Sequence, residues 1–170
     1  DYMGFIFYPG SKRFLTEKIP ELSENIKKTG VFVNLPVSEV IERIKEYDLH
    51  AVQLHGEETV QYCEELLLAL EQFKKGLKRP EVIKAFAIDA DFDFETLEPY
   101  QQVCDFFLFD TKGKDRGGNG IAFDWELLRG YAQKKPFFLS GGIGLETSGG
   151  LQLFLGSGIG KHCYAIDVNS

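Results

Sequence analysis

The sequence predicts an α/β fold with a parallel sheet. Apolar runs of strand length alternate strictly with segments of helical periodicity, giving about seven strands with about six helices between them. The run at residues 106–109 is apolar throughout, which is typical of a strand buried on both faces. This pattern favours a (βα)8 TIM barrel that lacks its first βα unit and its final helix. A doubly wound open sheet is the alternative.

The first half of the chain contains four predicted strands, at residues 2–8, 31–34, 51–56 and 82–86. A helix is expected to begin after Thr16, because apolar residues recur at helical spacing until Gly30 ends the pattern. A second helix is expected after Pro36. A third is expected after Thr59, whose hydroxyl is suited to the N-cap position.

The second half continues the alternation. Strands are expected at residues 105–110, 136–140 and 163–167, and helices at 93–100, 124–131 and 145–155. Asp124 is expected to cap the second of these helices. Gly149 and Gly150 lie inside the third, where each would cost roughly 1 kcal/mol relative to alanine.

The length of 170 residues indicates one domain, residues 1–170, which can bury roughly 70% of its unfolded surface. The formal net charge of -7 argues against a nucleic-acid partner and against a membrane-surface partner. Cys63, Cys104 and Cys163 are odd in number and lack metal-site spacing, so a reducing cytoplasm fits best. No apolar run approaches the ~20 residues of a membrane span. Both ends are expected to be cuts in a longer chain.

Residues with functional chemistry follow the predicted strands at their carboxyl ends. In a parallel α/β protein that edge is where ligands bind, because variable loops leave rigid strands there. The candidates are Arg13, Asn34, His55, Asp110, Gly141, Gly142, Asp167, Asn169 and Ser170.

Each candidate also has a structural interpretation. An aspartate at a strand end, such as Asp110, is often a turn or capping residue. Arg13 could be a solvated loop charge, and His55 a hydrogen-bonded structural histidine. Gly141 and Gly142 give a stronger signal, because a glycine pair between a late strand and a helix exposes amide donors to a phosphate.

Two other motifs do not fit a nucleotide site. Residues 156–161 are similar to a phosphate loop, but Leu155 stands where its first glycine belongs and His162 follows the lysine. The glycine-rich loop after Asp110 lacks the G-x-G-x-x-G spacing of a dinucleotide site.

Taken together, six segments resemble the phosphoribosylanthranilate isomerase family, a barrel enzyme family of tryptophan biosynthesis. They are residues 4–13, 30–34, 52–56, 110–125 (Asp110-Thr111-Lys112, Gly117-Gly118-Asn119-Gly120 and Phe123-Asp124-Trp125), 140–142 and 165–170. In that order and spacing the set is highly specific. The resemblance implies an Amadori rearrangement of a small phosphoribosyl substrate, without a metal or cofactor, by a monomer or homodimer.

The resemblance also implies roles for single residues. Asp110 is expected to be the general acid that opens the ribose ring, and Arg13 to contact the anthranilate carboxylate. Gly141 and Gly142, together with residues 167–170 (Asp167, Asn169 and Ser170 among them), are expected to hold the phosphate. His55 matches a position near the site without an assigned chemical role. Apolar Phe107 and Phe109 would favour a protonated acid if they pack beside it.

The chain departs from the family pattern in two places. The family's general base is a cysteine in a Lys-x-Cys-Gly motif on the first strand, and this motif is absent from the chain. The chain alone is therefore expected to be inactive. In residues 145–161, glycines replace an expected amphipathic helix. The rival hypotheses are another sugar-phosphate barrel enzyme and a phosphate-ligand-binding relative that lacks the base.

Overall fold

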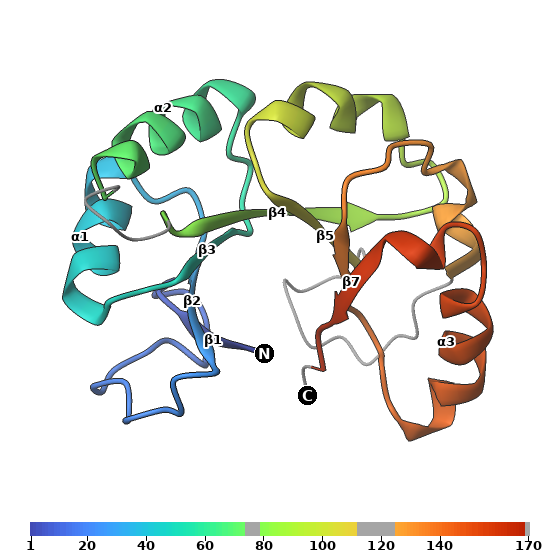
Figure 1. The fold of residues 1–170 in the computed structure, drawn as a ribbon, viewed down its shortest axis with the longest axis horizontal. Coiled ribbons are helices and arrows are strands. Elements are labelled where there is room, and N and C mark those ends of the chain that lie inside the picture. The colour runs from blue at the N-terminus through green and yellow to red at the C-terminus, as the bar shows by residue number, and fades with distance from the viewer. Residues whose placement is uncertain (74–78, 112–124, 169–170) are drawn as a thin grey trace. The chain divides into compact units, whose positions relative to one another are not determined.

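The computed structural model describes residues 1–73, 79–111 and 125–168 (Figure 1). The chain forms two compact units: unit 1 comprises Asp1–Lys84 with Gln102–Cys104, and unit 2 comprises Ala85–Gln101 with Asp105–Ser170. Strand β4 (Glu81–Ile88) begins in unit 1 and ends in unit 2. The predicted glycine-rich loop after Asp110 and the predicted N-cap Asp124 lie outside the described residues.

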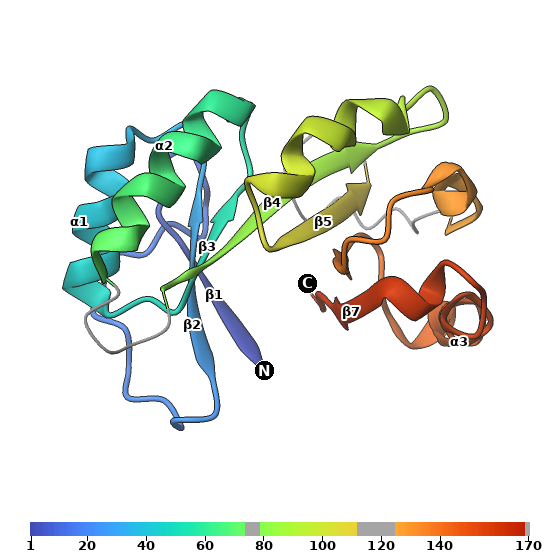
Figure 2. The ribbon, with the colours of Figure 1, turned by 45° about the horizontal axis from the view of Figure 1, so that its top comes forward.

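Unit 1 contains three complete strands and the start of β4. Its elements are β1 (Tyr2–Ile6), β2 (Lys27–Phe32), α1 (Val37–Tyr47), β3 (Ala51–Leu54), α2 (Val60–Leu70) and the 3-10 helix η1 (Glu71–Phe73). Helices α1 and α2 lie beside each other on one side of these strands (Figures 1 and 2). The apolar stripe of α1 is buried, and the ring of Phe7 stacks on Phe32 with centroids 5.2 Å apart.

Unit 2 contains the later strands with short helices between them. Its elements are η2 (Phe94–Gln102), β5 (Phe106–Thr111), η3 (Trp125–Gly130), β6 (Phe137–Leu139), η4 (Leu145–Thr147), α3 (Ser148–Leu155), η5 (Gly160–His162) and β7 (Cys163–Ile166). The helices predicted at 93–100 and 124–131 are 3-10 helices, and Pro99 lies inside the first of them. The helix predicted at 145–155 is confirmed as η4 followed by α3.

The strands follow one another in the sheet in the order β1-β2-β3-β4-β5-β6-β7. The pairs β1–β2, β2–β3, β3–β4, β5–β6 and β6–β7 are parallel. The predicted parallel α/β fold is confirmed. A doubly wound sheet reverses its strand order at a switch point, and this order has no reversal, so the open-sheet alternative is wrong.

The helix expected after Thr16 is wrong. The segment between β1 and β2 is an irregular loop, drawn in blue in Figure 1. Pro20 explains the difference, because proline removes a backbone donor and disfavours helical geometry in the residue before it. By contrast, Thr59 caps α2 as expected, since its Oγ1 accepts a hydrogen bond of 3.2 Å from the amide of Tyr62.

Candidate active site

Arg13 lies on a loop that returns to the carboxyl end of β1. The amide of Leu15 donates to the carbonyl of Ile6 at 2.8 Å, and Phe14 forms a parallel bridge with Ile6. The amide of Arg13 donates to Oγ of Ser11 at 3.1 Å. The exposed Arg13 side chain is therefore carried by a hydrogen-bonded turn at the carboxyl end of the strand.

His55 follows β3 directly and is half-buried. Its amide donates to the carbonyl of Phe32 at 2.8 Å, which fixes the backbone against the end of β2. Its Nδ1 lies 2.9 Å from Nε2 of Gln53. An amide group and a ring nitrogen at this distance form a hydrogen bond, which orients the imidazole ring.

Asp110 is the penultimate residue of β5 and is half-buried. Successive side chains of a strand point to opposite faces, so Phe107 and Phe109 project away from Asp110. Both rings pack on Tyr131, with centroid distances of 6.4 Å and 5.2 Å. The alternation of side chains along β5 therefore does not favour the packing on which the effect of these phenylalanines depends.

The loop after β6 has the backbone geometry that its glycines predict. Gly141 and Gly142 have φ angles of 91° and 60°, which residues with a Cβ rarely adopt. The hydroxyl of Thr147 lies 3.1 Å from the carbonyl of Gly142 and also accepts from the amide of Gly144 at 2.9 Å. The loop is therefore held in one shape by the start of the following helix.

Hydrogen bonds align the carboxyl ends of β5, β6 and β7. The amide of Ser140 donates to the carbonyl of Phe109 at 2.8 Å, and the amide of Asp167 donates to that of Leu139 at 2.8 Å. The Ser140 hydroxyl donates to Oδ2 of Asp167 at 3.2 Å. Unit 2 thus brings Asp110, the glycine loop and Asp167 to one edge of its sheet.

The remaining candidates are distributed differently. Arg13, Asn34 and His55 follow strands of unit 1, where neighbouring strand ends also meet at one edge. Asn169 and Ser170 lie outside the described residues. The described candidates therefore lie at the carboxyl ends of strands, as the sequence pattern predicted for a site of this fold.

Cys63 and Cys163 have the properties of structural thiols. Burial raises the pKa of Cys63 to about 11, with a smaller opposing effect from Lys84, and burial likewise raises the pKa of Cys163 to about 11. Burial also raises the pKa of Tyr62, with a contribution from Glu58. At neutral pH both thiols hold their protons, so neither is suited to act as a base.

Two polar residues near the candidate site were not among the predicted site residues. Lys84 and Glu58 are buried, with 3% and 4% of their surfaces exposed, and they form an ion pair. Lys84 interrupts an otherwise apolar run in β4. A single charge within a buried strand is the sequence signal that could have identified this pair.

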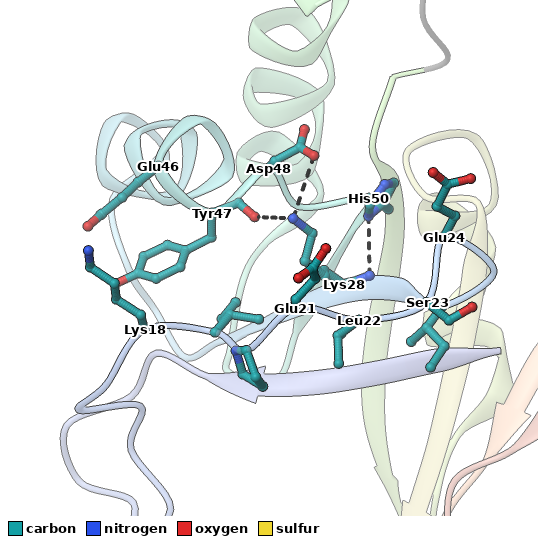
Figure 3. Close-up of a pocket in the computed structure, with 13 residues that line it drawn as sticks. Lys18, Glu21, Leu22, Ser23, Glu24, Lys28, Glu46, Tyr47, Asp48 and His50 are labelled. Atoms are coloured by element: carbon teal, nitrogen blue, oxygen red, sulfur yellow. Dashed lines mark hydrogen bonds and ion pairs between the residues drawn. The ribbon is translucent and has the colours of Figure 1, made fainter.

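A groove of about 710 Å³ lies at the other end of the strands of unit 1 (Figure 3). Two of the polar residues that line it, Lys28 and His50, already have partners. Nζ of Lys28 donates to the carbonyl of Tyr47 at 2.7 Å and lies 3.5 Å from Asp48, while Nδ1 of His50 accepts from the Lys28 amide at 3.2 Å. The groove is at the amino ends of β2 and β3, which is the edge opposite the candidate site residues.

Among the described residues, the acidic, histidine and cysteine side chains form no cluster of three suited to a metal ion. None of the described helices combines the length and apolar character that a membrane crossing requires. The segment similar to a phosphate loop precedes β7, and Oγ of Ser157 in it accepts from the amide of Gly160 at 3.1 Å. It is a turn that connects α3 to η5.

A family model described as N-(5'phosphoribosyl)anthranilate (PRA) isomerase matches residues 1–170. Two curated proteins named N-(5'-phosphoribosyl)anthranilate isomerase are similar to this chain. The protein from Phocaeicola vulgatus is 41% identical over 155 residues, which are 91% of this chain and 70% of the relative. The protein from Parabacteroides distasonis is 41% identical over 160 residues, covering 91% of this chain and 68% of the relative.

Solved structures of phosphoribosyl anthranilate isomerases also match this chain. The phosphoribosyl anthranilate isomerase of Thermotoga maritima matches with a TM-score of 0.76 and 31% identity, covering 99% of this chain and 76% of that one. A phosphoribosyl anthranilate isomerase in complex with reduced 1-(o-carboxyphenylamino)-1-deoxyribulose 5-phosphate matches with a TM-score of 0.72 and 28% identity, covering 100% and 76%. A structure of monomers generated from the dimeric Thermotoga maritima enzyme matches with a TM-score of 0.66 and 27% identity, covering 99% and 75%. The TIM-barrel type predicted from the sequence is confirmed by these matches.

Proposed function

This chain belongs to the N-(5'-phosphoribosyl)anthranilate isomerase family, and we propose a role in the isomerase reaction for each residue of its candidate site. The protein is an isomerase of tryptophan biosynthesis. It converts N-(5-phosphoribosyl)anthranilate to the 1-deoxyribulose aminoketose by an Amadori rearrangement. The shared edge of β5, β6 and β7 is the observation that supports the assigned roles most directly.

Asp110 is the general acid in this proposal. The reaction requires a proton on the ribose ring oxygen, so that the ring opens to a Schiff base. A general base must then take the sugar C2 proton to form an enolamine, and the family resemblance gives this role to the cysteine of the Lys-x-Cys-Gly motif, which residues 1–170 do not contain. Asp110 comes from a strand whose neighbours hold it in register, which suits a group that must approach one oxygen closely. The raised pKa values of Cys63 and Cys163 support leaving both thiols out of the base role.

Gly141 and Gly142 bind the phosphate. Their positive φ angles turn a loop that leaves a strand toward a following helix, and backbone amides in such a loop can donate to an anion without a side chain in the way. The family resemblance groups Asp167 with the phosphate-binding residues, but its carboxylate would repel a phosphate in direct contact. Its carboxylate is suited to accept from a sugar hydroxyl, while Asn169 and Ser170 supply donors for the phosphate.

Arg13 and His55 bind the anthranilate half of the substrate. A guanidinium forms paired hydrogen bonds with a carboxylate, which matches the acid group of anthranilate. The half-buried imidazole of His55, which follows the next but one strand, is a further polar group for this half of the substrate.

Residues 1–170 belong to a single TIM-barrel domain in this proposal, and the protein acts in the cytoplasm as a monomer or homodimer. The net charge of -7 and three cysteines without a disulfide support a soluble small-molecule enzyme in a reducing compartment rather than a nucleic-acid or membrane-surface protein.

Calorimetric titration of the intact protein tests the substrate assignment. The probe is reduced 1-(o-carboxyphenylamino)-1-deoxyribulose 5-phosphate, and the control is the same compound without its phosphate. We expect the phosphorylated compound to bind roughly 100-fold more tightly, because charge-assisted hydrogen bonds to the phosphate are lost in the control. Equal binding of the two compounds would show that the phosphate site is assigned wrongly.

A further inference from the structure

A buried ion pair joins β4 to the loop that follows β3. Nζ of Lys84 lies 3.2 Å from Oε2 of Glu58, and the two side chains are 4% and 1% exposed. Nζ of Lys84 also donates to the carbonyl of Gly56 at 2.9 Å. Charges at this depth must be paired and hydrogen-bonded, and here a single lysine reaches both the side chain and the backbone of one loop.

Glu58 connects that loop to the one after β2. Its Oε1 accepts from the amide of Asn34 at 2.8 Å, and its two oxygens accept from the amide of Gly56 at 3.1 Å and 3.0 Å. In return, Oδ1 of Asn34 accepts from the amide of Glu57 at 2.7 Å. Asn34 has a φ angle of 52°, so the turn after β2 adopts a conformation that asparagine tolerates better than most residues.

The packing around this network leaves little freedom. A Cβ on Gly56 would lie 2.7 Å from Oε1 of Glu58 and closer still to Oδ1 of Asn34. Real Cβ atoms do not approach oxygens so closely, so the side chains of Asn34 and Glu58 fit directly against the Gly56 backbone. The network therefore determines where the backbone runs, in addition to satisfying its own charges.

Stability alone is a weak explanation for this arrangement. A buried ion pair often contributes no more to the free energy of unfolding than apolar side chains of the same volume would. An apolar pair could not fix two loops through three backbone groups, as this pair does: the amides of Asn34 and Gly56, and the carbonyl of Gly56. The charged pair therefore fixes the positions of the two loops, and this effect matters more than its contribution to the free energy of unfolding.

We propose that Glu58 and Lys84 are positioning residues, which hold the loops after β2 and β3 so that His55 is presented to the substrate. His55 immediately precedes Gly56, whose amide and carbonyl are both held by the pair. This inference rests on the proposed role of His55 in substrate binding. Neither Glu58 nor Lys84 contacts the substrate, and both act through the loop.

The test uses the double variant Lys84→Met/Glu58→Gln of the intact protein, which removes both charges and keeps side chains of similar length. Its matched control is Arg43→Met/Glu46→Gln, which removes an exposed ion pair of α1. Steady-state kinetics are measured well below the unfolding temperature of every variant, together with hydrogen exchange of the Gly56 amide. We expect KM to rise roughly 10- to 100-fold with kcat changed by less than about threefold, and Gly56 to exchange roughly 10-fold faster. The control should change none of these values by more than about twofold.

Unchanged KM and kcat in the folded double variant would overturn the proposal, because the pair would then only stabilise the fold. A loss confined to kcat would overturn it as well. Should the double variant not fold, Asn34→Gly carries the same test, since it removes the acceptor for the Glu57 amide and keeps a positive φ accessible. A wild-type protein that binds no substrate would contradict the proposed function instead, and unaltered exchange at Gly56 would still overturn the positioning role.

Discussion

Gly150 of α3 lies directly against the indole ring of Trp125. A Cβ on Gly150 would come within 2.6 Å of Cζ3 of the ring, whereas a Cβ on the neighbouring Gly149 would meet no atom within 4 Å among the described residues. The ring of Trp125, which belongs to η3, also packs on Phe154 of α3, with ring centroids 6.3 Å apart. One glycine of the pair is therefore required by packing, and the other is not.

The two glycines should respond to alanine in opposite directions. Gly149→Ala should stabilise the protein by about 0.5–1 kcal/mol, because alanine loses less backbone entropy in a helix than glycine does. Gly150→Ala should destabilise it by roughly 1–3 kcal/mol, because the indole must move. Urea unfolding monitored by tryptophan fluorescence measures both changes. Equal effects of the two substitutions would contradict the contact with Trp125.

Cys63 and Cys163 should react with iodoacetamide only at high pH. With a pKa of about 11 against an ordinary value of 9.0, each thiol has a thiolate fraction at pH 8 that is roughly 100-fold below that of an ordinary cysteine. The rate should rise with pH until about pH 11. Peptide mapping by mass spectrometry separates the two sites, and the urea-unfolded protein is the control. Rapid alkylation of native Cys163 at pH 7 would disprove the assigned raised pKa.

The same shift predicts a loss of stability in alkali. The folded state favours the neutral thiol, so this contribution to the free energy of unfolding is fully present below about pH 9. It is lost as the pH rises through about 11. Unfolding curves measured between pH 8 and pH 11 should therefore show a declining midpoint. Replacement of Cys163 by alanine should reduce the decline.

The sequence predicted most of the strands because burial on both faces leaves an unbroken apolar signal. Residues 106–109 and 137–139 are examples, and Phe107, Phe109, Phe137 and Phe138 are buried as expected. The helix after Thr16 could not be predicted reliably from apolar spacing, since Pro20 interrupts a pattern that otherwise has helical periodicity. The 3-10 geometry of η2 and η3 is decided by tertiary packing, which periodicity does not describe.

The sequence predicted those residues of the candidate site that are defined only by their position at the end of a strand. Asp110, Gly141 and Gly142 each follow or end an apolar run, and parallel strands place such residues at one edge. The Glu58–Lys84 pair was not predictable in the same way, because its geometry depends on the register of β3 against β4, in which Leu54 lies opposite Lys84. A charge within an apolar strand indicates a partner but does not identify it.

Asp110→Asn in the intact protein should lower kcat by roughly 10²- to 10⁴-fold, because the amide cannot donate a proton to the ring oxygen. Binding of the reduced product analogue should change by less than about threefold, since the side chain keeps its shape. Asp91→Asn, at an exposed position in the same unit, is the control and should leave both values unchanged. Near-normal turnover by Asp110→Asn would remove this residue from the mechanism.

Two substitutions of Gly142, whose φ angle is 60°, separate the effect of charge from the effect of shape. Asn and Asp have the same size and both tolerate this conformation better than other residues with a Cβ, so Gly142→Asn and Gly142→Asp impose similar strain. Only the aspartate adds a negative charge where we place the phosphate. We expect KM to rise roughly 10-fold more in Gly142→Asp than in Gly142→Asn, with similar kcat in the two variants. Because salt screens exposed charges, added KCl should narrow the difference in KM between the two variants.

Gly158→Ala, where a Cβ would meet no atom within 4 Å among the described residues, is the control for an unrelated glycine. Equal KM values for the Asn and Asp variants would mean that no anion binds beside Gly142.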